Sequence, residues 1–243
     1  MPLYHHKHTR PESIPLSGLI CYFNMDDTGS QAVDSVNGVT MSAAGNMINS
    51  VKGVKNTCWQ AGAQGDYLSG TQSAFTLPSN FTLNLWVYVS AAVGYNATVF
   101  EFGDYSDNNG FGFYMQPSSG KISGRMKQDF DQYGSGVISN NTWTMLTMTY
   151  DGSYVKTYIN GVQDKSRSYS TSVATTTKLG AFSRSATSGQ ESGEYFLGKL
   201  DEIGLWDYAM PTSGIKDLMN LYTTPLSTSG FDDLGHSIAF TSA

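Results

Sequence analysis

Two adjacent carboxylates, Asp201 and Glu202, stand inside an otherwise apolar run of the 243-residue chain, within FLGKLDEIGLWDY. Acids in such surroundings act in catalysis, bind a metal ion or accept hydrogen bonds that support the fold. A retaining glycosidase holds two carboxyl groups about 5–5.5 Å apart, and the spacing Glu-x-Asp-x-x-Glu on a strand supplies that geometry. The sequence lacks this pattern, and its glutamates are scattered: Glu12, Glu101, Glu191, Glu194 and Glu202.

Strand geometry separates the adjacent pair. Successive side chains on a regular strand point to opposite faces, so Asp201 and Glu202 cannot act together on one bond. Alternation places Asp201 on the face of Ile203 and Leu205, which points it inward, and leaves Glu202 as its solvated neighbour. The four histidines lie close to the two chain ends, so no Ser-His-Asp set is indicated. We therefore predict that the protein is not an enzyme.

The elements that position these residues are predicted to be strands. FTLNLWVYVS (81–90) alternates strictly, with Phe and aliphatic side chains on one face and Thr, Asn, Trp and Tyr on the other. WTMLTMTYDGSYVKTYINGVQ (143–163) carries Asp-Gly and Asn-Gly between alternating runs, which predicts a meander of three antiparallel strands. The spacing of Ile215, Leu218, Met219 and Tyr222 predicts one short helix over 211–222.

The remaining segments add strands around this centre. A first strand is predicted at 18–25, followed by a polar, glycine-punctuated loop at 26–45. Short strand pairs are predicted within 56–70 and 97–116. The whole pattern indicates an all-β sandwich of two antiparallel sheets with one short C-terminal helix.

Composition narrows the function classes. The net charge is −6, which argues against nucleic acid as a partner because such binders concentrate Lys and Arg. No stretch approaches about 18 continuous apolar residues, so no membrane insertion is expected, and the N-terminus shows no apolar signal-peptide core. Cys21 and Cys58 fit two buried free thiols better than one bridge.

The chain divides into three parts. Residues 1–16 have no hydrophobic period and form a predicted N-terminal arm. A single β domain spans 17–223, and a polar tail covers 224–243, where SIAF could add an edge strand. An arm of this kind needs another surface to order it, which favours a homo-oligomer.

Six segments carry a resemblance to a known family. In chain order they are GLICYFNMDDT, DSVNG, QGDYLSG, FTLNLWVYV, NTWTMLTMTYDGSYVKTYINGV and FLGKLDEIGLWDYAMPTSGIKDLMNLY. This order resembles the concanavalin A-like lectin/glucanase superfamily, in its laminin-G-like branch, over about residues 17–223. The resemblance implies a jelly-roll sandwich of two curved antiparallel sheets. Fold alone does not define function, because the family includes sugar binders, adhesion modules and appendages of larger enzymes.

The resemblance also implies a candidate structural calcium site. Members often hold Ca²⁺ between the acids that follow the opening strand, here Asp26 and Asp27, and the closing strand, here Asp201. Calcium needs about six to eight oxygen ligands. The alternative for Asp201 is a buried structural acid that accepts hydrogen bonds from backbone N–H groups.

Carbohydrate recognition needs exposed aromatic rings that stack on sugars, with amides and acids for the hydroxyls. The aromatic residues of predicted loops and of the non-core face are the candidates: Tyr105, Phe130, Tyr133, Trp86 and Tyr88. Trp86 matches a common fold position of the family, so its alternative role is packing beneath a covering segment.

Three functions are consistent with this sequence. We favour a non-enzymatic structural or attachment protein of an assembled particle, in particular a phage virion component such as a fibre, capsid decoration or tail protein. Such a protein lies at the virion surface, binds other subunits through residues 1–16 and recognises cell-surface glycan. A secreted, extracellular carbohydrate-binding module is the alternative, and a glucanase-type glycoside hydrolase is the second alternative.

Overall fold

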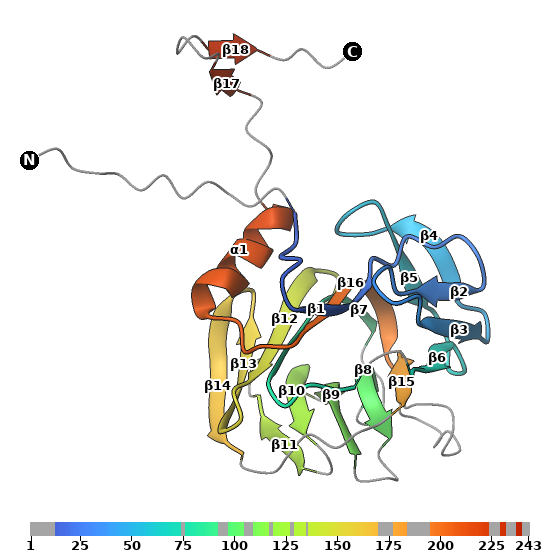
Figure 1. Ribbon diagram of the computed structural model, residues 1–243. Coiled ribbons are helices and arrows are strands. Elements are labelled where there is room, and N and C mark those ends of the chain that lie inside the picture. Colours follow the sequence, from blue (N-terminus) through green and yellow to red (C-terminus); the bar gives the residue numbers. More distant parts are fainter. Residues whose placement is uncertain are drawn as a thin grey trace, which may run out of the picture.

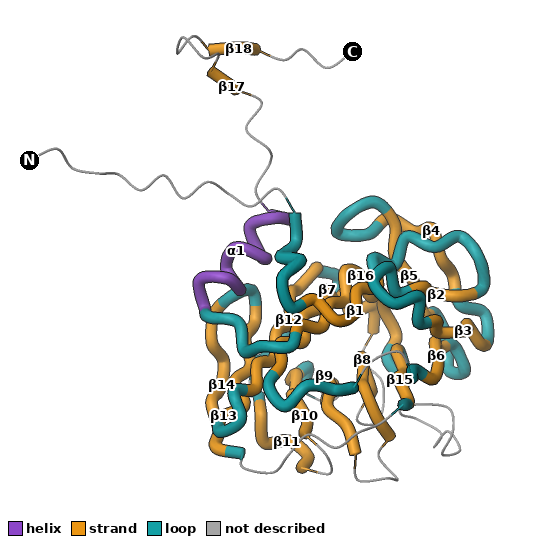
Figure 2. Tube along the Cα trace, viewed as in Figure 1, coloured by secondary structure: helices purple, strands orange, loops and turns teal. Residues whose placement is uncertain are grey.

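The computed structural model describes residues 13–73, 76–91, 97–104, 109–116, 119–126, 129–134, 136–169, 177–183, 195–223, 229–231 and 237–239. For 91, 104, 109, 129–133, 229–231 and 237–239 it describes the backbone alone. Within these residues, antiparallel strands make up most of the protein and one helix accompanies them (Figure 2).

The strands form two facing antiparallel sheets (Figure 1). The helix-side sheet has, in spatial order, β14 (Val162–Ser168), β13 (Tyr154–Ile159), β12 (Trp143–Tyr150), β7 (Phe81–Ala91), β16 (Leu197–Trp206), β5 (Thr57–Ala61) and β4 (Ile48–Lys52), and β1 (Leu19–Phe23) also pairs with β16. The opposite sheet has β11 (Asp129–Tyr133), β10 (Lys121–Met126), β9 (Asn109–Gln116), β8 (Ala97–Asp104), β15 (Lys178–Ala181), β6 (Tyr67–Thr71), β3 (Thr40–Ala44) and β2 (Gln31–Val33). This arrangement confirms the predicted jelly-roll sandwich.

The main core lies between the sheets, as the alternation of β7 predicts. The apolar face of β7, from Phe81 to Val89, is fully buried in this core. The ring of Phe81 stacks on Phe111 of the opposite sheet, with centroids 4.0 Å apart. Tyr150 of β12 extends the aromatic contact at 6.0 Å from Phe81.

The predicted meander is also confirmed. β7, β12, β13 and β14 pair in succession. Asn160 and Gly161 have φ values of 50° and 74°, the left-handed conformation that a two-residue hairpin turn of type I′ requires. Gly152, in the turn between β12 and β13, has φ 88°.

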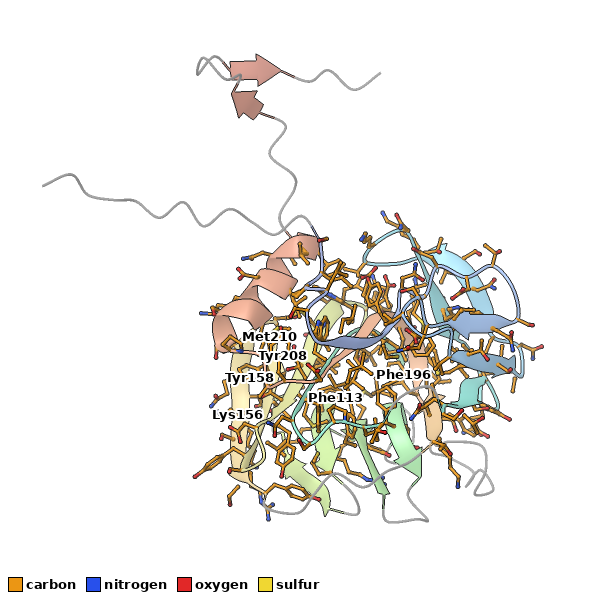
Figure 3. The ribbon with its side chains drawn as sticks, viewed as in Figure 1. Phe113, Lys156, Tyr158, Phe196, Tyr208 and Met210 are labelled. Carbon is orange, nitrogen blue, oxygen red and sulfur yellow. The ribbon has the colours of Figure 1, made fainter. Side chains whose placement is uncertain are left out.

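The helix α1 (Thr212–Thr223) covers the outer face of the helix-side sheet. It buries Ile215 and Leu218 against a second cluster that includes Trp86, Met145, Tyr158 and Trp206. The segment leading into it is held by Thr82, whose hydroxyl donates to the Tyr208 carbonyl at 2.7 Å and accepts from the Met210 N–H at 2.8 Å. Figure 3 shows Tyr158 and Met210 close beneath the helix, with Lys156 farther along β13.

Several sequence predictions of strand pairing were wrong. The predicted loop 26–45 contains the antiparallel pair β2 and β3. The strands predicted to pair within 56–70 are β5 and β6, which lie in different sheets. The connection between them therefore crosses from one sheet to the other, and a local pattern does not reveal which partner a short strand selects.

The two chain ends fall mostly outside the described residues, including 1–12 of the predicted arm. Where the description begins, Ile14 packs against the helix-side cluster, and the Pro15 carbonyl accepts a hydrogen bond from the Trp206 indole at 2.8 Å. In the tail, β17 (Ser229–Phe231) pairs with β18 (Ser237–Ala239) as a separate two-stranded sheet, so SIAF does not extend the sandwich. Both cysteines are buried and free, as predicted.

Candidate functional site

A β-bulge in β16 governs the two adjacent acids. Asp201 pairs with Trp86 and Gly204 with Asn84, so between these pairs β16 carries one residue more than β7. Within the bulge, Glu202 has φ 52°, a left-handed conformation that residues other than glycine seldom adopt. The extra residue breaks the alternation, so the prediction that Asp201 points inward with Ile203 and Leu205 was wrong: those two residues face the main core, and both carboxylates reach the helix side of the sheet.

Glu202 is buried and joins three elements. Its Oε2 accepts hydrogen bonds from the hydroxyls of Tyr22 on β1 and Tyr222 on α1. Only 2% of the residue is exposed, so the prediction of a solvated neighbour was wrong. Burial is the main cause that raises the pKa of Glu202, and the two tyrosine donors act in the opposite direction. The carboxylate therefore fastens the opening strand and the helix to the closing strand.

Asp201 is fully buried and supports a neighbouring turn. Its Oδ2 accepts from the backbone N–H of Val54 at 2.8 Å and of Lys55 at 3.2 Å. A side chain at Gly53 would collide with this oxygen, so the turn closes directly over the acid. Desolvation, followed by the charge of Glu202, raises the pKa of Asp201 to about 8. These contacts match the alternative of a buried structural acid.

The three aspartates considered for calcium do not converge on a common point. Asp26 accepts from the Thr57 N–H, the Thr57 hydroxyl and the Asn56 amide, and Asp27 accepts from the Val33 N–H. Among the described residues, no group of three or more His, Cys, Asp or Glu side chains could hold a metal ion. Hydrogen-bond donors already contact most of these carboxylate oxygens, whereas Asp201 Oδ1 is buried with no partner among the described residues, so a calcium site at these acids stays a prediction.

Another buried acid, Glu101, lies on the outer face of the opposite sheet. It accepts a hydrogen bond from Tyr114 on β9, and the guanidinium carbon of Arg125 on β10 lies 4.7 Å from the Tyr114 ring centroid. Gly112 and Gly180 face Glu101 from the two adjacent strands, which keeps its sides clear of larger side chains. In the sequence Glu101 is only one of the scattered glutamates, because strand register is needed to bring these groups together.

The predicted sugar-binding aromatics have different surroundings. Trp86 is 2% exposed and contacts Tyr222 edge-on at 5.6 Å, so it has no open face for a sugar. Tyr88 is half-buried, with Trp143 at 5.6 Å and the Lys199 ammonium 5.0 Å from its ring centroid. Tyr105 lies outside the described residues.

Phe130 and Tyr133 belong to β11, where the structure describes the backbone alone. Their role in sugar binding, like that of Tyr105, stays a prediction.

A cavity of about 370 Å³ opens at the end of the β13–β14 hairpin. It is lined by Gly152, Ser153, Tyr154, Ser168 and Tyr169. Tyr154 is 49% exposed, whereas Tyr169 is almost buried. The sequence pattern predicts a hairpin in this segment but does not mark Tyr154 as a binding residue. The exposure of Tyr154 depends on how much of the sheet the helix covers, and the local sequence pattern does not show the position of the helix.

The chain belongs to a known family. A laminin-G-type family model described as the concanavalin A-like lectin/glucanases superfamily matches residues 61–216. The family resemblance found in the sequence is thereby confirmed. No curated protein matches the sequence.

Solved structures show the same fold at low sequence identity. Domain 4 of AbnA, a GH43 extracellular arabinanase from Geobacillus stearothermophilus solved with arabinotriose, is 18% identical at a TM-score of 0.66 and covers 84% of this chain and 98% of its own. The binding domain of Paraclostridial Mosquitocidal Protein 1 is also 18% identical, with a TM-score of 0.66 and 90% of this chain covered.

A botulinum neurotoxin type C structure, from a study of cell entry through two ganglioside molecules, is 14% identical at a TM-score of 0.64 and covers 91% of this chain. The present chain spans about half the length of these two toxin chains, 55% in each case. At such identities the likeness shows the fold, and the fold is one that carbohydrate-binding and receptor-binding domains share.

The buried Asp201 predicts a specific pH dependence of stability. Its folded pKa lies near 8 and its ordinary value is 3.8, so the folded state retains a proton that the unfolded chain releases. The stabilising contribution is complete below about pH 4 and is lost as the pH rises towards about 8. The free energy of unfolding should therefore fall between about pH 5 and 8, and Asp201→Asn should flatten this fall.

Denaturant unfolding at several pH values measures the effect. Asp151→Asn is the matched control, because partial burial acts to raise the pKa of Asp151 but the N–H groups of Tyr154 and Ser153 and the ammonium of Lys156 hold it below its usual value. That group titrates below the window, so its replacement should leave the slope unchanged. An unaltered slope in Asp201→Asn would show that Asp201 is already ionised in the folded protein.

Proposed function

We propose that this protein is a non-enzymatic attachment protein that binds glycan through its lectin-like sandwich. The observation that carries the proposal is the fold, which the chain shares with a domain solved with arabinotriose and with a toxin chain associated with gangliosides. What those proteins bind supports a class of ligand for this chain, namely carbohydrate.

The placement of the buried acids supports binding without hydrolysis. A retaining glycosidase needs two carboxyl groups facing one bond, about 5–5.5 Å apart. Asp201 accepts from the backbone of a turn, and Glu202 accepts from Tyr22 and Tyr222, so both are committed to the fold. Glu101 is held by Tyr114, which gives it a structural role as well.

We further propose that the attachment module works on an assembled particle, with a phage virion surface as the specific case. Residues 1–12 then reach a neighbouring subunit, while Ile14 and Pro15 hold the base of the arm against the domain. The extracellular alternative is a secreted carbohydrate-binding module. It draws support from the arabinanase domain, which is one part of a larger extracellular enzyme.

Glycan binding is tested with the purified full chain on an array of neutral and sialylated glycans. We expect saturable binding to a subset of glycans and no cleavage of those glycans on prolonged incubation, followed by mass spectrometry. Failure to bind any glycan would overturn the proposed function. Cleavage products that disappear in Glu101→Gln would instead revive the hydrolase.

The particle role is tested by the mass of the chain in solution. Light scattering should give a multiple of the monomer mass for the full chain and a lower multiple after removal of residues 1–12, because this deletion spares Ile14 and Pro15. Circular dichroism of both proteins serves as the folding control. A full chain that is monomeric at all concentrations would contradict assembly through the arm.

A further inference from the structure

We infer that the cavity at the end of the β13–β14 hairpin is the sugar-binding site, with the ring of Tyr154 as the surface on which a neutral sugar stacks. This inference rests on the proposed glycan-binding function and assigns it to particular residues. The cavity lies at the open end of the β13–β14 hairpin, away from the helix. The turn of this hairpin, at Gly161, is next to Lys216 of α1, and β14 runs from that turn to Ser168 at the cavity (Figure 1).

Tyr154 is an exposed aromatic side chain on a sheet face that is covered elsewhere by the helix. It begins β13 on the outer face of the sheet, on the side where Tyr158 is buried beneath α1. Because the helix ends before this point, Tyr154 keeps 49% of its surface exposed. Aromatic rings that are half in contact with the protein offer an apolar face to sugar C–H groups and a hydroxyl at their edge.

Contacts within the protein hold the backbone around the cavity in place. The Tyr169 ring meets Tyr150 edge-on at 5.6 Å, and the Tyr169 N–H donates to the Ser153 carbonyl at 2.8 Å. Asp151 Oδ1 accepts from the N–H groups of Ser153 at 3.0 Å and Tyr154 at 2.7 Å, which fixes the turn. A site built in advance loses little conformational entropy on binding.

The polar groups around the cavity suit a neutral ligand. Ser153 and Ser168 are among the lining residues, and serine hydroxyls can both donate to and accept from sugar hydroxyls. Two nearby opposite charges form an ion pair, because the Lys156 ammonium lies 3.6 Å from Asp151 Oδ2. Arg167 stands opposite Val155, a core residue, and so alternates to the other face of β14.

The size of the cavity limits the ligand to a short segment of glycan. Its volume of about 370 Å³ is near the lower end of the range for small-molecule sites, which runs from about 300 to 1,000 Å³. One or two sugar units of a longer chain fit such a site, while the rest of the glycan extends into solvent.

Tyr88 is the competing aromatic platform, and its surroundings are less favourable. The Lys199 ammonium lies 5.0 Å from the Tyr88 ring centroid, and Trp143 packs against the same ring at 5.6 Å. A sugar would have to displace these contacts, whereas no ring or charge contact to the Tyr154 side chain is found among the described residues.

The test compares variants of the full chain by isothermal titration calorimetry with arabinotriose, cellotriose, maltotriose and lactose, and with sialyllactose as the anionic probe. We expect a neutral sugar to bind the wild type, Tyr154→Ala to weaken that affinity about tenfold or more, and Tyr154→Phe to keep it within about threefold. Val162→Ala, at the other end of β14 and 67% exposed, is the matched surface control and should bind as the wild type does.

The outcomes separate the two proposals. If the wild type binds a sugar and Tyr154→Ala binds it equally well, the proposed function stands and the assignment to this cavity is wrong. Loss of binding in Tyr88→Ala but not in Tyr154→Ala would place the site at the other aromatic platform. Binding of sialyllactose alone would overturn the neutral ligand class. A wild type that binds no glycan, on the array or in solution, overturns both proposals.

Discussion

The fold depends on one buried carboxylate, that of Glu202, which accepts hydrogen bonds from Tyr22 and Tyr222. Through it the opening strand, the closing strand and the C-terminal helix meet at a single point. A buried acid is costly unless donors surround it, and here two hydroxyls supply them. Glu202 has a left-handed backbone within the β-bulge of β16. In this conformation its side chain reaches both tyrosine hydroxyls.

This arrangement also decides which surfaces are left for function. The helix, anchored through Tyr222, covers Trp86 and Tyr158 and removes them from contact with ligands. It leaves the far end of the same sheet face open, where Tyr154 borders a cavity. The acids that first attract attention thus serve the fold, and a tyrosine on an ordinary hairpin becomes the better candidate for binding.

The sequence predicts the parts of the structure that depend on local patterns. The alternation of the strand that starts at Phe81, the Asn160-Gly161 turn and the helix that begins at Thr212 are all in place because neighbouring residues determine them. The orientation of Asp201 could not be predicted, since the bulge that turns it away from Ile203 and Leu205 has no local sequence signal, and the burial of Glu202 depends on the helix that covers it. The exposure of Tyr154 depends equally on tertiary packing, which local periodicity does not encode.

A double-mutant cycle between Glu202 and Tyr222 tests this account most directly. Glu202→Gly removes the carboxylate while suiting the left-handed backbone, and Tyr222→Phe removes one donor without changing the ring. Urea unfolding of the wild type, both single variants and the double variant should give a coupling of about 1.5–3 kcal/mol, the range for a hydrogen bond to a charged group. Additive effects, within about 0.5 kcal/mol, would show that Glu202 does not hold the helix to the sheet.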